Sequence, residues 1–176
     1  RIFGALNIMK SAYTFRRGNS DDINQIKKVT LHAYMQFRNV ISNENARAWE
    51  VNLGNEMTYK ELIHLGTCFV SEYKGKIVGC AFLIPHGKPF KWFQSDWAYI
   101  RLVAVHPDCK GKGIGKQLTQ LCIDAATSAG EKTIALHTSE FQNAARHIYE
   151  SVGFTKLIDL ELMYGKQYYL YTLRLE

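Results

Sequence analysis

The chain has 176 residues, of which 47% are hydrophobic and 22% charged, which is the composition of a folded globular protein rather than of a disordered one. No run of about 18 apolar residues occurs, so we expect no membrane-spanning helix and no membrane partner. The formal net charge of +6 invites a nucleic-acid-binding function. However, the lysines concentrate in one glycine-rich stretch without an arginine-rich helix, so no nucleic-acid partner is expected.

The cysteines and histidines give no sign of disulfides or of metal binding. The 4 cysteines are scattered without a C-x-x-C pair, and the 6 histidines show no pair at helical spacing. Reduced thiols are typical of the cytoplasm. We therefore predict a cytoplasmic protein without a metal site.

The first residues of the chain read poorly as a native start. Met9 followed by Lys10 resembles a natural initiator, so residues 1–8 are expected to be a leader that is either derived from an expression vector or disordered. Residues 9–176 contain no repeat and no low-complexity linker, and we expect them to form a single domain.

The N-terminal region is predicted to hold one strand and several helices. Alternating aromatic and polar residues predict a strand over residues 12–16. An amphipathic helix follows, with Ser20 or Asp21 as its cap. Further helices are expected near residues 43–49 and 58–65, and Gly54 and Asn55 break the helical pattern between them.

A hairpin and an aromatic loop come next. Residues 68–73 and 76–84 read as two strands around a Lys-Gly turn. Residues 85–95 form a loop with three aromatic residues, which is either a lip of a binding site or a loop folded back on its own sheet. An apolar strand over residues 96–105 follows it. In the C-terminal part we predict a strand over residues 133–137, a helix over residues 141–151, and an antiparallel pair of strands over residues 155–163 and 167–175.

The strand that ends at residue 105 leads into a glycine-rich basic turn. Gly111, Gly113 and Gly115 stand at alternate positions among lysines, and the apolar residues that follow have helical spacing. In such a turn, backbone N–H groups and the helix dipole can hold a phosphate, and glycines let the backbone approach it closely. The pattern therefore predicts a phosphate-binding site.

The spacing of this turn distinguishes between known phosphate loops. A Walker A loop has one residue more between its glycines and a Ser or Thr where Gln117 stands, and a dinucleotide fingerprint has its third glycine one residue later. The segment from Lys110 to Gly115 instead resembles the R/Q-x-x-G-x-G/A pyrophosphate loop of the GNAT superfamily of N-acetyltransferases, with Lys110 in place of Arg or Gln. A second segment, from Asn143 to Phe154, is similar to the N-x-A-x-x-x-Y-x-x-x-G-F segment of the same superfamily.

This resemblance implies a fold and a reaction. The implied fold is α/β, the GNAT fold, with a mixed central sheet of about seven strands, helices on both faces, and splayed fourth and fifth strands. The implied activity is transfer of an acetyl group from acetyl-CoA to a primary amine by direct attack in a ternary complex, with CoA as product and a small molecule favoured as acceptor. The alternatives are a non-catalytic acyl-CoA-binding module of the same fold, and an acetyltransferase for protein lysines or N-termini. A monomer or a homodimer is expected.

The resemblance also implies the residues that bind the cofactor. Main-chain groups of the central strand are expected to polarise the thioester carbonyl, the glycine turn to hold the pyrophosphate, and Asn143 to bond the cofactor arm. The expected cofactor-binding residues are Leu102, Val103, Ala104, Val105, Lys110, Gly111, Lys112, Gly113, Ile114, Gly115, Lys116, Asn143, Arg146 and Tyr149.

Catalytic roles follow from the same comparison. Tyr149 occupies the family's general-acid position, although it could instead only pack against the cofactor sulfur. His137 is a possible base, because histidine titrates in the right range, and a structural role is the alternative. Asp96, Tyr99 and Glu140 are other candidates, and many members of the superfamily have no dedicated base.

The acceptor site is expected among the variable segments. Trp92, Phe93, Asp96, Tyr99 and Glu140 are its candidate contacts. Phe37, Trp49 and Tyr59 are either acceptor contacts or core residues. Acids near the expected mouth would attract a cationic amine, whereas the aromatic loop favours a small molecule with an apolar part.

Overall fold

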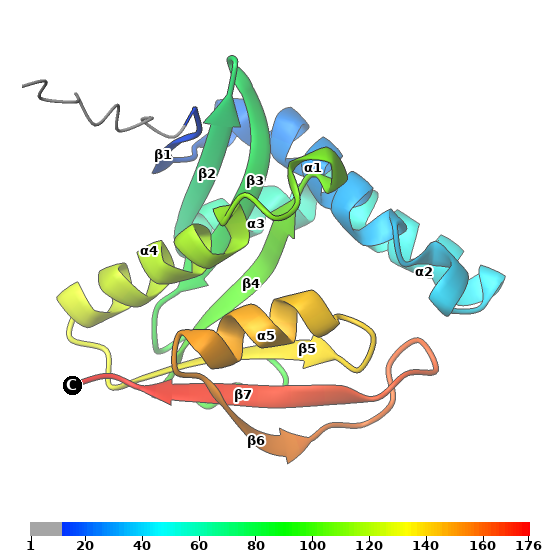
Figure 1. The fold of residues 1–176 in the computed structure, drawn as a ribbon. Coiled ribbons are helices and arrows are strands. Elements are labelled where there is room, and N and C mark those ends of the chain that lie inside the picture. The colour runs from blue at the N-terminus through cyan, green and yellow to red at the C-terminus, as the bar shows by residue number, and fades with distance from the viewer. Residues whose placement is uncertain (1–11) are drawn as a thin grey trace, which may run out of the picture.

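The computed structural model describes residues 12–176, so the expected leader over residues 1–8 lies outside the described residues (Figure 1). The helices and strands follow one another in the order β1 (Thr14–Arg17), α1 (Ile23–Met35), α2 (Asn43–Gly54), α3 (Glu56–Leu65), β2 (Thr67–Tyr73), β3 (Lys76–Ile84), β4 (Ala98–Val105), α4 (Ile114–Ser128), β5 (Thr133–Ser139), α5 (Asn143–Ser151), β6 (Thr155–Asp159) and β7 (Tyr168–Arg174).

The strands form a 7-stranded sheet in the order β1-β2-β3-β4-β5-β7-β6. The pair β4–β5 is parallel, and the other neighbouring pairs are antiparallel. One hydrophobic cluster joins α1 and α3 to one face of the sheet, and a second joins α4 and α5 to the other face (Figure 1). The predicted mixed sheet with helices on both faces is confirmed.

The centre of the sheet is split between β4 and β5. These strands pair only at Ala98–Ile134 and Tyr99–Ala135, and Figure 1 shows them diverging beyond that point. On its other side, β4 carries an irregularity in its register with β3, and Leu102 in this segment has a φ of 52°. Such a bulge bends a strand and re-aims its backbone groups. The predicted splay of the fourth and fifth strands is therefore confirmed.

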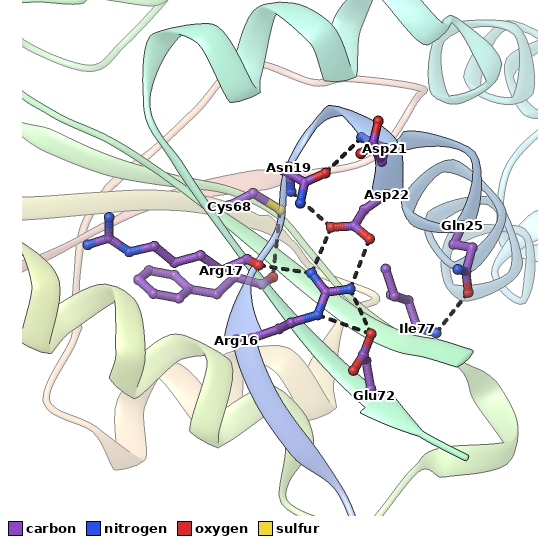
Figure 2. Close-up of polar contacts among 10 residues, drawn as sticks. Arg16, Arg17, Asn19, Asp21, Asp22, Gln25, Cys68, Glu72 and Ile77 are labelled. Carbon is purple, nitrogen blue, oxygen red and sulfur yellow. Dashed lines mark hydrogen bonds and ion pairs between the residues drawn. The ribbon is translucent and has the colours of Figure 1, made fainter. Parts of the chain in front are cut away.

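An ion-pair cluster ties β1 to its neighbours (Figure 2). The Arg16 guanidinium donates to both carboxylate oxygens of Asp22 at 2.8 and 2.9 Å, and also to Glu72 on β2 at 2.7 Å. Asp22 in turn accepts from the backbone N–H of Asn19, whose side chain accepts from Asp21 N–H. Asn19, not Ser20 or Asp21, is thus the cap of the turn that leads into α1.

The main differences from the predicted boundaries lie after β5. Helix α5 begins at Asn143 rather than at residue 141, because the Gln142 side chain accepts hydrogen bonds from Ser139 N–H and Oγ and closes a turn first. Strand β6 ends at Asp159, short of the predicted residue 163. The chain then makes a separate tight turn closed by the bridge between Met163 and Lys166.

Candidate active site

The glycine turn lies between the end of β4 and the start of α4. Gly111 and Gly113 have φ values of 71° and 77°, which side chains rarely adopt, and Gly113 directly precedes the helix. A Cβ atom at either residue would meet nothing within 4 Å, so the backbone borders open space. The first-turn N–H groups of α4 have no partner within the helix. This turn fits the predicted phosphate site.

Gly115 has a different role from the other two glycines. It is buried, and a Cβ atom there would lie 3.3 Å from the Cδ1 atom of Ile148 on α5. Gly115 therefore allows α4 to pack closely against α5, and it does not border the open space of the turn. Its backbone N–H belongs to the first turn of α4, so a direct contact of Gly115 with the pyrophosphate stays a prediction.

A cavity of about 550 Å³ opens where β4 and β5 separate. Its lining comes from α1, α2, α3, the loop before β4, strands β4 and β5, α5 and the C-terminal segment. Of the predicted cofactor and catalytic residues, Leu102, Val103, His137 and Tyr149 line it. The structure therefore brings the bulge of β4 and both candidate catalytic side chains together.

Tyr149 presents a protonated phenol to this cavity. The residue is 7% exposed, and burial raises the pKa of its hydroxyl well above the usual value. Its ring packs against Phe154 with 6.1 Å between centroids. No residue in the described part of the chain forms a hydrogen bond with its hydroxyl. The hydroxyl is thus available to a ligand.

His137 lies on β5 among aromatic rings, with the Trp92 ring 5.3 Å and the Phe93 ring 5.9 Å away. Its Nδ1 atom is buried without a hydrogen-bond partner among the described residues. Burial first, and then the charges of Arg101 and Lys91, lower its pKa to about 3. His137 is therefore a neutral imidazole at physiological pH.

The first turn of α5 differs in part from expectation. Asn143 is exposed, accepts a hydrogen bond from Arg146 and does not line the cavity. Arg146 also donates to the Glu140 carbonyl at 3.3 Å and lies over the Tyr169 ring. Gln142, which no motif position marked, lines the cavity instead. The sequence could have indicated Gln142 only through its position directly before the motif residue Asn143.

The aromatic loop is both a lip and a folded-back segment. Phe93 is buried and stacks on Tyr99 with 4.4 Å between ring centroids, while the Tyr99 hydroxyl donates to the Lys88 carbonyl at 2.8 Å. Phe90 and Lys91, from the same loop, line the cavity. Neither of these two was among the predicted contacts.

The remaining predicted acceptor residues divide in the same way. Trp49 and Tyr59 line the cavity, while Phe37 packs on Phe141 at 5.3 Å. Asp96 and Glu140 are exposed and lie outside the lining.

The cavity is positively charged rather than acidic. Lys91 and Arg101 are the charged side chains in its lining, and none of the described lining residues is Asp or Glu. Among residues 12–176 there is also no cluster of three or more His, Cys, Asp or Glu side chains that could hold a metal, and no helix long and apolar enough to cross a membrane. All 4 cysteines are buried as free thiols.

Comparison with known proteins gives one family. The model of the acetyltransferase (GNAT) family matches residues 34–154. Over 91 residues the chain is 40% identical to the "Probable N-acetyltransferase camello" of Xenopus laevis. This matched segment covers 51% of this chain and 39% of that protein. The chain thus spans well under half of that relative.

Solved structures share the fold. The paia N-acetyltransferase of Thermoplasma acidophilum, in complex with coenzyme A, has a TM-score of 0.75 at 14% identity and covers 92% of this chain and 98% of its own. The yncA protein of Salmonella typhimurium, with acetyl-CoA, has a TM-score of 0.68 at 23% identity and covers 94% and 95%. At these identities the likeness shows the fold alone.

Proposed function

The chain belongs to the acetyltransferase (GNAT) family, and on that premise we propose that it transfers an acetyl group from acetyl-CoA to the primary amine of a small molecule. One observation carries the proposal. The cavity at the split between β4 and β5 brings together the bulged strand and the Tyr149 hydroxyl, which has no hydrogen-bond partner among residues 12–176, and β4 runs from this site to the glycine turn.

The glycine turn would hold the pyrophosphate of acetyl-CoA. Gly111 and Gly113 leave open space beside the backbone, and Lys110, Lys112 and Lys116 are all exposed at this turn. Backbone N–H groups and lysines together favour a polyanion. The fold neighbours whose structures contain acetyl-CoA or coenzyme A support this choice of cofactor. Asn143 and Arg146 remain candidates for the cofactor arm.

The bulge in β4 would serve the thioester. Beyond Tyr99, β4 has no pairing with β5, so the backbone groups of residues 102–105 on that side are open to a ligand. A main-chain N–H at this place can stabilise the oxyanion that forms when the carbonyl is attacked. Backbone groups perform this role, so the side chains of Leu102 and Val103 shape the cavity rather than react.

The proposed reaction has a defined proton balance. The neutral amine nitrogen bonds to the acetyl carbon, the carbon–sulfur bond breaks, the amine loses a proton and the sulfur gains one. Tyr149 donates its proton to the departing sulfur as general acid. His137 stays a candidate base, but its pKa of about 3 makes it a weak proton acceptor. Water at the cavity mouth can take the proton instead.

A small acceptor suits the shape of the cavity. About 550 Å³ lies within the range of small-molecule sites, and α2 and the segment around Tyr164 help to enclose it. The lining contains many aromatic rings, which favours an acceptor with an apolar part. A cytoplasmic location and a monomeric or homodimeric state remain predictions.

The test combines binding and turnover. Thermal stability is measured without ligand, with CoA and with acetyl-CoA, and free thiol release is followed against a panel of amines. A cofactor-dependent rise in melting temperature with amine-dependent thiol release is expected. Stabilisation without release from any amine would favour the non-catalytic acyl-CoA-binding module. No stabilisation by either cofactor would refute the cofactor assignment.

A further inference from the structure

We propose that Arg101, assisted by Lys91, binds a carboxylate of the acceptor, so that the substrate is an amine carrying both a carboxylate and an apolar group, as in an apolar α-amino acid. This inference rests on the proposed function, because it names the acceptor class of the same site. It reverses the expectation of a cationic acceptor, which came from acids that lie outside the cavity lining.

The geometry of Arg101 is that of an unused anion-binding group. It belongs to β4, directly before Leu102 at the bulge, and lines the cavity. Its guanidinium lies 4.3 Å from the centroid of the Phe90 ring. A cation–π contact uses none of the guanidinium N–H donors, so a carboxylate can still accept two of them. No described residue forms a hydrogen bond or an ion pair with it.

The charge balance around Arg101 calls for an anion. The group is largely buried, and desolvation lowers the pKa of its guanidinium. Glu61 and Arg101 both line a smaller adjacent cavity, and the charge of Glu61 acts to raise this pKa, but the two side chains form no ion pair among the described residues. A buried charge without a partner is costly, and such costs are typical of binding sites. A ligand carboxylate would offset this cost.

Lys91 adds a second positive charge at the same ring. Its ammonium lies 5.5 Å from the centroid of Phe90 and 5.2 Å from that of Trp92. Its φ is 50°, so the loop holds this residue in a turn conformation that places it in the cavity lining. The lowered pKa of His137, to which both cations contribute, is consistent with a positive potential inside the cavity.

The rest of the lining indicates what accompanies the carboxylate. The aromatic residues Tyr34, Trp49, Phe90, Tyr164 and Tyr168 surround the space. Trp49 is 5.3 Å from Tyr34 and 5.6 Å from Tyr164, measured between ring centroids, so these rings form one continuous wall. Polyamines and other multiply charged cations would meet two positive charges and this apolar wall. An apolar group beside a carboxylate matches both features.

The first experiment measures binding and does not depend on turnover. 3-Phenylpropionate and its neutral amide are titrated while tryptophan fluorescence is followed, because Trp49 lines the cavity. The variants are Arg101→Gln, Arg101→Lys and the control Arg17→Gln, whose exposed side chain in Figure 2 points away from the ion-pair cluster. We expect the carboxylate to bind about tenfold to a hundredfold more tightly than the amide, as for hydrogen bonds to charged groups.

Each variant has a distinct expected result. Arg101→Gln should remove the preference for the carboxylate without weakening the amide, Arg101→Lys should keep part of it, and Arg17→Gln should keep all of it. Equal binding of the acid and the amide by the unmodified protein, or no saturable binding of the acid, would overturn the proposal. If Arg17→Gln lost the preference for the carboxylate as fully as Arg101→Gln, the preference would be an effect of net charge, and the proposal would also be overturned.

The second experiment separates this inference from the proposed function. Thiol release from acetyl-CoA is measured with apolar α-amino acids, their amides, and spermidine. Faster transfer to the acids supports the proposal, whereas equal or faster transfer to the amides or spermidine refutes it while the acetyltransferase activity stands. Selective carboxylate binding without transfer to any amine would instead refute the proposed function and keep the carboxylate site.

Discussion

Replacing Tyr149 by phenylalanine removes one oxygen atom from the wall of the cavity and tests the general acid. We expect kcat to fall by about 10²–10⁴-fold, the usual contribution of a placed proton donor, which is about 3–5 kcal/mol of activation free energy. Acetyl-CoA binding should change little, because the ring that packs on Phe154 remains. The loss should therefore appear in kcat rather than in KM.

The same substitution should hardly affect stability, and Tyr171→Phe provides the matched control. The Tyr149 hydroxyl has no hydrogen-bond partner in the described chain, so its loss leaves no buried group unsatisfied. The buried Tyr171 hydroxyl donates to Glu150 Oε1 at 2.8 Å, outside the cavity lining. Tyr171→Phe should thus cost about 1 kcal/mol of unfolding free energy and leave kcat unchanged.

The assay is steady-state thiol release over a range of pH, with unfolding by urea in parallel. Burial raises the pKa of Tyr149, so the phenol stays protonated and the ratio of wild-type to variant kcat should be constant from about pH 6 to 9. A variant kcat within about twofold of wild type at every pH would remove Tyr149 from the mechanism, since general acids contribute far more. A large loss of stability in Tyr149→Phe would mean that the hydroxyl is structural.

Three further predictions concern the glycine turn, the β1 ion pairs and His137. Gly113→Val should weaken acetyl-CoA binding by about tenfold or more, because a residue with a side chain rarely adopts a φ of 77°. Binding is measured by titration calorimetry with Gly54→Ala as the control, and equal affinities of Gly113→Val and wild type for acetyl-CoA would contradict the phosphate-binding role of the glycine turn. Asp22→Asn should cost about 1–2 kcal/mol in urea unfolding near pH 7. Arg16 lowers the pKa of Asp22 in the folded state, so the ion pair contributes fully above the unfolded pKa of about 4, and its contribution is lost as the pH falls through the folded pKa. If the difference in unfolding free energy between wild type and Asp22→Asn stayed the same at low pH, it would contradict this prediction. His137, with its lowered pKa, should show no imidazole titration by NMR between about pH 5 and 8, and a titration near pH 6.5 would refute the lowered pKa. The unfolded state takes up a proton on this histidine below about pH 6.5 and the folded state does not, so the unfolding free energy of the wild type should fall as the pH is lowered from there. His137→Gln should remove this part of the pH dependence.

Much of the fold could be predicted from local patterns because each pattern has a local cause. Lys74 and Gly75 have φ values of 49° and 74°, so the Lys-Gly pair forms the tight turn that joins β2 and β3 as predicted. Gly54 and Asn55 separate α2 from α3 as expected, and Asn55 accepts a hydrogen bond from Met57 N–H as the cap of α3. The predicted cap before α1, Ser20 or Asp21, was wrong: Asn19 caps this turn, because several consecutive residues there have side chains that can cap a helix.

The site was predicted where motifs mark it and was missed where distant segments meet. Tyr149 and the β4 bulge came from a resemblance that fixes position along the chain, and both line the cavity. Lys91 and Arg101 belong to no motif, and their shared contact with Phe90 arises only when the aromatic loop folds against β4. Asp96, one of the acids expected near the mouth, is exposed and lies outside the cavity lining, so the charge of the cavity could not be predicted from the order of charges along the sequence.

The charge of the cavity also bears on the absence of an obvious base. An ammonium group that enters beside Arg101 and Lys91 experiences the same positive charges that help to lower the pKa of His137, and its own pKa falls for the same reason. The amine then reaches its neutral, reactive form with less help from a protein base. A carboxylate on the same molecule is attracted to Arg101 and Lys91, whereas the ammonium group is not. The carboxylate therefore binds the acceptor, and the amine loses its proton more easily near the same cations. NMR titration of His137 with and without 3-phenylpropane-1-sulfonate, an anion that stays ionised near pH 3, would test this balance: the bound anion should raise the imidazole pKa, and no change would mean that the cations do not set the potential at the reacting nitrogen.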